Sequence, residues 1–413
     1  MKKFITIILT LVSLATIFVA CGKPDNSDNS SGTDNSDEVK EILLYDFEDY
    51  DKSFQLMRVC GYFGAVNVNK DAKYVKSGKR SALLQPLGPE SLGNAQGVTE
   101  GNPETCLYIP LSSQKYGFDY TDGNKLAEVR FSIYNAENKN LNLYVSLIME
   151  KKAQRLSPCE TFALKPGWNE VFYTPDHSVI AINDDLKQCY GVALNFDNVH
   201  SRYLKDAPKL YLDDVSITLA DKPFETENLV VLKDREICDF ESDWQKYVLM
   251  SKVDDSSNAP DMEIVKASDY GLVAPSGDRV LRVTMRPTNL IVGTVYNGFG
   301  FTQALIDAVG FDKYGDDDYF AFDVYNASDV PLDFPTVFWN TKENGYKGLN
   351  VLVNPGDWAT ARISLGMLDE LFGKGERTYR DNPSNVVIQW AEFTGEERVA
   401  FFDNFRIEKG ATK

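Results

Sequence analysis

Few residues of this chain have the types and spacing that catalysis requires. There are only two histidines, His177 and His200, and neither has a metal-like partner. The sequence contains no G-x-S-x-G, no H-E-x-x-H and no phosphate-binding glycine loop. Its 61 acidic residues could always include a glycosidase carboxylate pair, but the acidic runs at 184–185 and 316–318 are typical of solvated loops. We therefore expect a protein that is not an enzyme.

The cysteines are the second group that could carry chemistry. Beyond Cys21 the chain has five of them, which are Cys60, Cys106, Cys159, Cys189 and Cys238. An odd number cannot pair completely, and none of them has a metal-site spacing such as C-x-x-C. Buried free thiols are the favoured interpretation, and a disulfide between Cys159 and Cys189 is the alternative.

An internal repeat defines the organisation of the chain. Four sequence segments recur in the same order, 189 to 193 residues further on. Asp46-Phe47-Glu48 recurs as Asp239-Phe240-Glu241, and residues 131–138 recur as 322–329. The segment 164–168, which ends in Pro-Gly-Trp, recurs with one inserted residue as 353–358, and 210–217 recurs as 400–407. Chance does not preserve such an order. We expect two copies of one domain, at 41–221 and 230–409, joined near 221–223.

The local pattern within each copy indicates β-strands. Apolar and polar residues alternate over 129–134 and 141–149 in the first copy and over 332–338 in the second. Gly, Pro, Asn and Asp clusters interrupt these runs at short intervals, and the best helix candidate is the short segment 302–309. Strands with one buried face and frequent turns predict an all-β fold of antiparallel sandwiches.

These landmarks resemble a known family. A D-F-E strand opens each copy, a Pro-Gly turn and a tryptophan precede a later strand, and D-D-V-S-I (213–217) or D-N-F-R-I (403–407) closes it. This pattern looks like the galactose-binding-like jelly roll of many carbohydrate-binding modules, and it covers nearly the whole chain after residue 40. The resemblance implies two tandem jelly-roll sandwiches, but one scaffold hosts many functions.

The resemblance also implies a structural calcium ion in each domain. In related modules, acids on the opening and closing strands hold it together with backbone carbonyls, as hard cations require. Glu48 with Asp213 or Asp214 matches that pattern in the first copy, and Glu241 with Asp403 matches it in the second. The alternative is that these strand-end acids cap backbone groups or face solvent.

Two aromatic residues are candidates for ligand contact. Trp339 follows Phe338 on a strand whose inward positions are even-numbered, so alternation turns Trp339 outward, and Tyr144 faces the same way in the first copy. Sugar rings stack their C–H faces on such planes. Trp168 and Trp358 hold equivalent places and are expected to pack, and Trp390, which aligns with Phe196, is expected in the core.

The first residues predict export. Lys2 and Lys3 precede an apolar run over 4–19, which is the plan of a signal peptide at 1–20. The segment 18–21 resembles the lipobox of bacterial lipoproteins, which implies a lipid on Cys21; Phe18 departs from the usual leucine. Residues 21–40 have almost no apolar side chain and should form a flexible acidic tether. An ordinary signal peptide or an uncleaved anchor is the alternative.

Charge and organisation together lead to a functional hypothesis. A net charge of −18 argues against nucleic acid as a partner. We expect a lipoprotein of the outer membrane that faces the cell exterior, with the periplasmic face as second choice, and that captures a polysaccharide or oligosaccharide. Outer-membrane transport proteins are further expected partners. The alternative is a structural, adhesive or transporter-accessory protein whose sandwich faces bind proteins.

Overall fold

The computed structural model describes most of the chain after residue 39. The described residues are 40–49, 58–59, 64–87, 106–111, 121–149, 157–196, 199, 203–252, 260–287, 297–340, 345–372, 378–390 and 395–410. The predicted signal peptide and tether, with Cys21, lie outside these ranges, and so does Cys60. Among the described residues, no helix is long and apolar enough to cross a membrane.

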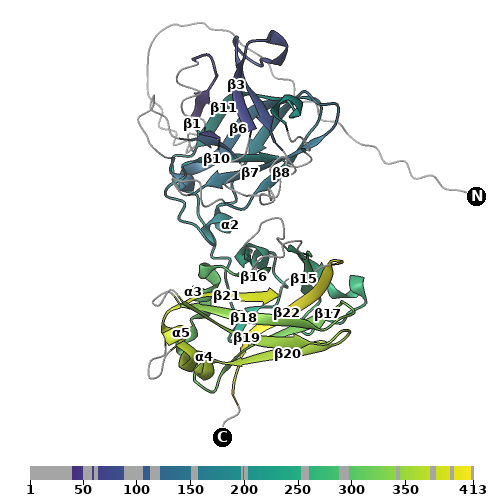
Figure 1. The fold of residues 1–413 in the computed structure, drawn as a ribbon. Helices are drawn as coiled ribbons and strands as arrows, with labels where there is room; N and C mark the ends of the chain where they lie inside the picture. Colours follow the sequence, from purple (N-terminus) through teal and green to yellow (C-terminus); the bar gives the residue numbers. More distant parts are fainter. Residues whose placement is uncertain are drawn as a thin grey trace, which may run out of the picture. The chain divides into compact units, whose positions relative to one another are not determined.

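The first half of the chain forms two antiparallel sheets (Figure 1). One sheet has the order β3 (Gly64–Asn69), β4 (Ser81–Pro86), β11 (Leu210–Leu219), β6 (Leu126–Asn135) and β9 (Gly167–Tyr173), and β1 (Lys40–Tyr45) also pairs with β11. The other has the order β2 (Arg58–Val59), β5 (Leu107–Pro110), β10 (Gly191–Phe196), β7 (Leu141–Ile148) and β8 (Glu160–Leu164).

The second half repeats this topology strand by strand. Its first sheet has the order β14 (Asp261–Lys266), β15 (Arg279–Met285), β22 (Arg398–Glu408), β17 (Tyr319–Asn326) and β20 (Trp358–Ser364), and β12 (Glu236–Cys238) pairs with β22. Its second sheet has the order β13 (Leu249–Lys252), β16 (Asn297–Phe301), β21 (Pro383–Trp390), β18 (Leu332–Asn340) and β19 (Gly345–Val353). This topology agrees with the sequence repeat, although the domain boundaries at 41–221 and 230–409 stay predictions.

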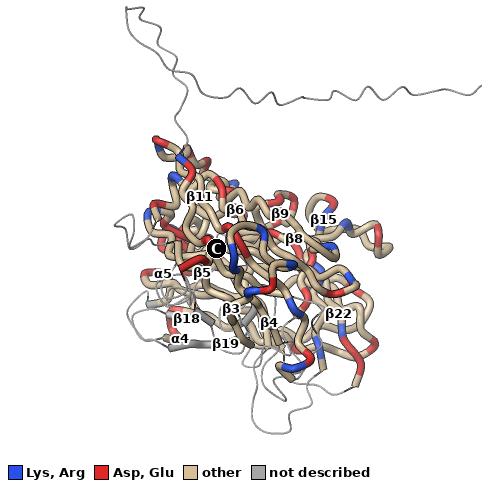
Figure 2. The backbone as a smooth tube through the Cα atoms, turned by 90° about the horizontal axis from the view of Figure 1, so that it is seen from above, with Lys and Arg blue, Asp and Glu red and all other residues tan. Residues whose placement is uncertain are grey.

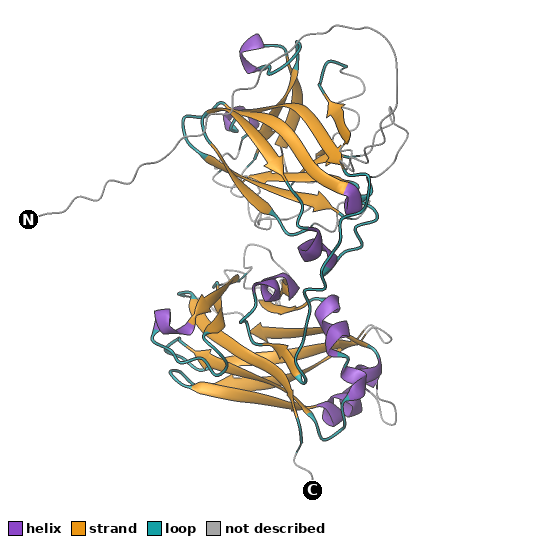
Figure 3. Cartoon of the chain, turned by 180° about the vertical axis from the view of Figure 1, so that it is seen from behind, coloured by secondary structure: helices purple, strands orange, loops and turns teal. Residues whose placement is uncertain are grey.

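In the part of the chain that the structure describes, helices are few and short, and they connect strands (Figure 3). In the first half these are η1 (Ala72–Tyr74), η4 (Gly123–Lys125), α2 (His177–Ala181) and η5 (Leu204–Asp206). In the second half they are η6 (Asp243–Val248), η8 (Ala267–Tyr270), α3 (Gln303–Val309), η9 (Phe311–Lys313), α4 (Leu365–Phe372) and α5 (Thr378–Asp381). Helix α3 confirms the helix predicted over 302–309, because Thr302 lies at its N-cap position.

Each pair of sheets encloses its own apolar core, so each half is a β-sandwich. In the first, inward side chains of β6 and β7, such as Phe131 and Leu143, are fully buried together. In the second, Phe322 of β17 and Phe334 of β18 meet in the same way. The predicted alternation is thus confirmed, and the fold is all-β with two tandem antiparallel sandwiches. Along the described backbone, acidic and basic residues are interspersed (Figure 2).

Candidate functional site

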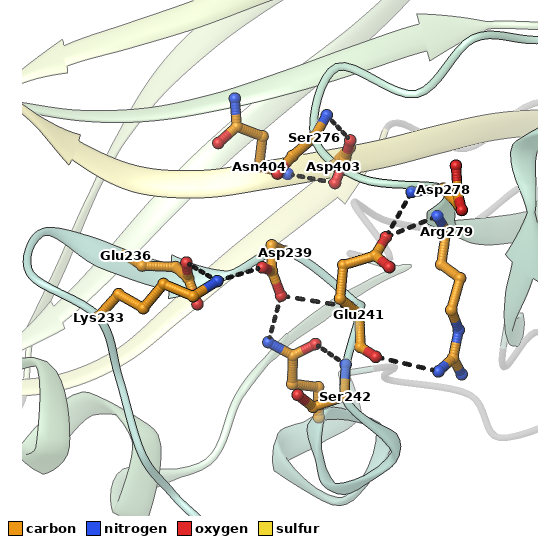
Figure 4. Close-up of polar contacts among 11 residues, drawn as sticks. Lys233, Glu236, Asp239, Glu241, Ser242, Ser276, Asp278, Arg279, Asp403 and Asn404 are labelled. Carbon is orange, nitrogen blue, oxygen red and sulfur yellow. Dashed lines mark hydrogen bonds and ion pairs between the residues drawn. The ribbon is translucent and has the colours of Figure 1, made fainter.

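The repeated acids of the second sandwich surround the turn between η8 and β15 (Figure 4). Just after β12, Phe240 adopts a left-handed φ of 59° and is fully buried. Its neighbour Glu241 extends to the turn, where its Oε1 accepts the backbone N–H groups of Asp278 (2.8 Å) and Arg279 (2.7 Å). From β22, the Oδ2 atom of Asp403 accepts the N–H of Ser276 at 2.8 Å.

The first sandwich has the same arrangement. The Oε1 atom of Glu48 accepts the N–H groups of Lys79 (2.6 Å) and Arg80 (2.8 Å). The Oδ2 atom of Asp213 on β11 accepts the N–H groups of Lys76 (2.9 Å) and Ser77 (3.3 Å). The structure therefore brings together the predicted residues Glu48 and Asp213, which are far apart in the sequence, around one turn.

Asp214 and its counterpart Asn404 both have left-handed φ angles, of 50° and 54°, which Asp and Asn tolerate better than most residues. Their side chains take different partners. Asp214 Oδ1 accepts the hydroxyl of Ser77 at 2.5 Å, whereas the amide of Asn404 donates to Asp323 at 2.8 Å. The exchange of Asp for Asn thus redirects one contact and leaves the backbone unchanged.

The pKa values of these carboxyl groups reflect their surroundings. The backbone N–H of Lys79 holds the pKa of Glu48 below its ordinary value. Burial raises the pKa of Asp213 to about 6 and that of Asp403 to about 8, because both side chains are fully enclosed. Hydrogen bonds from backbone N–H groups oppose that rise in both cases.

The donor arrangement does not fit the calcium ion that the sequence predicts. Two N–H groups already occupy Glu48 Oε1, and two more occupy Asp213 Oδ2. Converging N–H dipoles form a site for an anion rather than for a cation. Within the described ranges, no group of three or more His, Cys, Asp or Glu side chains could hold a metal ion. Calcium at these positions stays a prediction without support from this geometry.

One part of the site was missed by sequence reasoning. The turn residues Ser77-Gly78-Lys79-Arg80 recur as Ser276-Gly277-Asp278-Arg279, a repeat that could have been found in the sequence. Glycine is needed here, because φ is +66° and +60° and an added Cβ would lie 2.4 or 2.3 Å from an atom of the glutamate carboxylate. The arginine guanidinium donates to the carbonyl of the same glutamate at 3.3 Å in both copies.

The two candidate ligand contacts lie on outer sheet faces, but they are not equivalent. Trp339 is partly exposed near the end of β18, where it pairs across the strands with Tyr346 of β19. Its counterpart in the first sandwich is Ile148, which is fully buried. Tyr144 is partly exposed on β7, opposite Asn195 and Thr161, and its counterpart is Pro335.

Three other tryptophans, Trp168, Trp358 and Trp390, pack against other side chains. Trp168 meets Tyr134 edge-on at 5.4 Å between ring centroids, and Trp358 meets Tyr325 at 5.7 Å. Trp390 is buried in the second core. The shared packing role predicted for the equivalent pair Trp168 and Trp358 is confirmed.

Four of the cysteines are described, which are Cys106, Cys159, Cys189 and Cys238. The favoured interpretation of buried free thiols holds for Cys189 and Cys238, and Cys159 is partly exposed. The alternative disulfide between Cys159 and Cys189 is not formed. Burial raises the pKa of Cys189 to about 12, so that thiol is unreactive at neutral pH.

No protein-family model matches the sequence, and no curated protein matches it. Among solved structures, the chain is similar to a tandem pair of family 22 carbohydrate-binding modules from Paenibacillus barcinonensis, with 11% identity, a TM-score of 0.28 and coverage of 91% of this chain and 99% of that one. It is also similar to a family 11 carbohydrate-binding module from Clostridium thermocellum, with 13% identity, a TM-score of 0.30 and coverage of 44% and 98%. An exo-β-agarase matches over 44% of this chain and 26% of its own, with 11% identity and a TM-score of 0.32. Because these TM-scores are low, the fold assignment rests only on the sheets of this chain.

Proposed function

We propose that this protein is a non-catalytic surface lipoprotein that binds carbohydrate and holds it for uptake or degradation. In this proposal the lipid on Cys21 anchors the chain to the outer membrane, and residues 22–40 give the sandwiches reach. Two sandwiches on one tethered chain would raise the effective concentration for a polymeric ligand. The bound class would be a polysaccharide or oligosaccharide, and transport proteins of the outer membrane would receive it.

The position of Trp339 is the observation that carries this proposal. The even-numbered residues of β18, such as Phe334 and Phe338, are buried in the core, so Trp339 lies on the opposite face of the sheet. An indole ring on a sheet face offers a flat apolar surface to the C–H face of a sugar. Few other side chains offer such a large contact area while losing so little conformational entropy when a ligand binds.

Polar side chains accompany Trp339 on this face. Gln389 of β21 is partly exposed, and it lies between the buried residues Ile388 and Trp390 of the core. Asn350 of β19 is exposed and donates a hydrogen bond to Asp333 of β18 at 2.9 Å. Amide and carboxylate groups at these positions can form hydrogen bonds with sugar hydroxyls. Ligand sites usually combine an apolar contact surface with a few polar groups that fix the orientation of the ligand.

A polysaccharide array tests the proposal with the soluble fragment 41–413 and its Trp339→Ala variant. We expect binding to at least one glycan, and a loss of at least about tenfold in affinity for the variant, which is about 1.4 kcal/mol. Phe172→Ala is the matched control, because Phe172 is an aromatic residue that is 46% exposed on β9 of the first sandwich. Binding to no glycan would contradict the proposal and favour a protein-binding role, and binding that is indifferent to Trp339 would exclude this site.

A further inference from the structure

The connection from η1 to β4, and its counterpart from η8 to β15, lies against the first sheet of each sandwich and is attached at several points. In the first sandwich the Tyr74 ring stacks on Tyr211 of β11, with centroids 4.1 Å apart and planes at 5°. In the second, Tyr270 packs on Phe401 of β22 at 5.1 Å. Two residues beyond these ring contacts on each strand lie Asp213 and Asp403, which bind the same connection through its backbone.

A glutamate attaches the far end of each connection. Glu48 follows β1 and Glu241 follows β12, and each binds two consecutive N–H groups directly after the turn glycine. The carboxylate oxygen thereby fills a concavity of backbone N–H groups, which is the arrangement that protein backbones use for bound anions. We call the pair Glu48 and Asp213, and likewise Glu241 and Asp403, the carboxylate clamp.

Both oxygens of each clamp aspartate already accept backbone N–H groups. In the second copy, Asp403 uses Oδ2 for Ser276 and Oδ1 for the N–H of Asn404. In the first copy, Asp213 Oδ1 likewise accepts the N–H of Asp214 at 3.0 Å. A cation bound by these atoms would compete with the backbone N–H groups that they accept.

We propose that the carboxylate clamp holds this connection in both sandwiches without a metal ion, in the place where the sequence pattern implies structural calcium. In each clamp, backbone N–H groups of the connection donate to both the glutamate and the aspartate. The glutamate contacts are the same in both copies although the turns differ, with Lys79 in one and Asp278 in the other. This role does not depend on the ligand proposed above.

Thermal unfolding of the full chain tests the clamp. We expect the same melting temperature in EDTA and in millimolar calcium chloride. Glu48→Ala and Glu241→Ala should each lower the melting temperature by at least about 4 °C, because two N–H groups lose a charged acceptor. Glu263→Gln is the control, since Glu263 makes only an exposed ion pair with Arg282 and should change little.

Three results would overturn the proposal. These are a melting temperature that calcium raises and EDTA lowers by several degrees, a Glu241→Ala variant as stable as the control, and fast exchange of the Asp278 and Arg279 amide hydrogens that calcium slows. The exchange measurement uses the unaltered chain, so it decides the question even if the alanine variants do not fold. Slow exchange of these amides in EDTA would support the clamp.

Discussion

At the scale of single residues, Arg380 is among the largest fully buried side chains of the protein's described part. Its Nε donates to Asp369 at 2.5 Å, its Nη1 donates to the carbonyl of Tyr314 at 2.7 Å, and its Nη2 contacts Asp316. The prediction that 316–318 is a solvated acidic loop is wrong for Asp318, which is 7% exposed. Asp316 is exposed as predicted, although it also contacts this buried guanidinium.

Arg380→Met should strongly destabilise the second sandwich. The substitution keeps an apolar stem but leaves Asp369, which is 5% exposed, without its cation. Breaking a buried ion pair from one side costs about 3–5 kcal/mol, and urea unfolding would measure that loss. Arg286→Met is the control, because its pair with Asp261 is exposed and should contribute less than about 1 kcal/mol. Equal effects of the two variants would contradict this assignment.

At the scale of elements, Asp318 joins three segments of the second sandwich. Its carboxylate accepts a hydrogen bond from the guanidinium of Arg235, just before β12, at 3.1 Å. It also accepts the backbone N–H of Gly315, before β17, at 2.9 Å, and that of Gly410, after β22, at 3.3 Å. Local sequence spacing could not predict these contacts, because Arg235 is 83 residues and Gly410 is 92 residues away from Asp318 in the chain.

Asp318 should make the second sandwich sensitive to acid. Burial raises the pKa of Asp318, but hydrogen bonds from Gly315, Arg235 and Gly410 outweigh it and hold the pKa below its ordinary value. The unfolded chain has a pKa of about 3.9 for this group. Its contribution is therefore fully present above that pH and is lost as the pH falls through the lower, folded pKa.

The difference in unfolding free energy between the unaltered chain and Asp318→Asn measures this effect. It should be constant near neutral pH and shrink as the pH falls from about 5 toward 3, because the unaltered carboxylate then becomes protonated. Urea titrations at several pH values would show the trend. A difference that does not vary over this range would mean that the ionised form of Asp318 has no stabilising role.

At the scale of the whole molecule, the two sandwiches are two copies of one strand topology. Every strand pairing within the described ranges lies inside one half, and the core clusters around Phe131 and Phe322 each combine both sheets of their own half. The copies have diverged on the outer face of the second sheet, where Trp339 replaces Ile148 and Pro335 replaces Tyr144. The second copy is therefore the better candidate for ligand binding.

The fragments 38–226 and 227–413 should each fold alone. Both are within the usual size of a domain and keep both of their sheets. Calorimetry should show one cooperative transition for each fragment, near the corresponding transition of the full chain. A fragment without a cooperative transition would show that the copies depend on each other for stability.

The sequence by itself determined the repeat, the strands and the inward side chains, because alternation and turn residues are local properties that any pairing of the strands must respect. Phe334 and Phe338 were placed correctly on that basis. It also marked Glu48 and Asp213 as special through their recurrence. Only the tertiary structure decided what these acids contact, since Asp213 meets Lys76 across 137 residues and Glu48 meets Lys79 across 31. These residues come together only when the strands pair, and the pairing puts backbone N–H groups in front of both carboxylates.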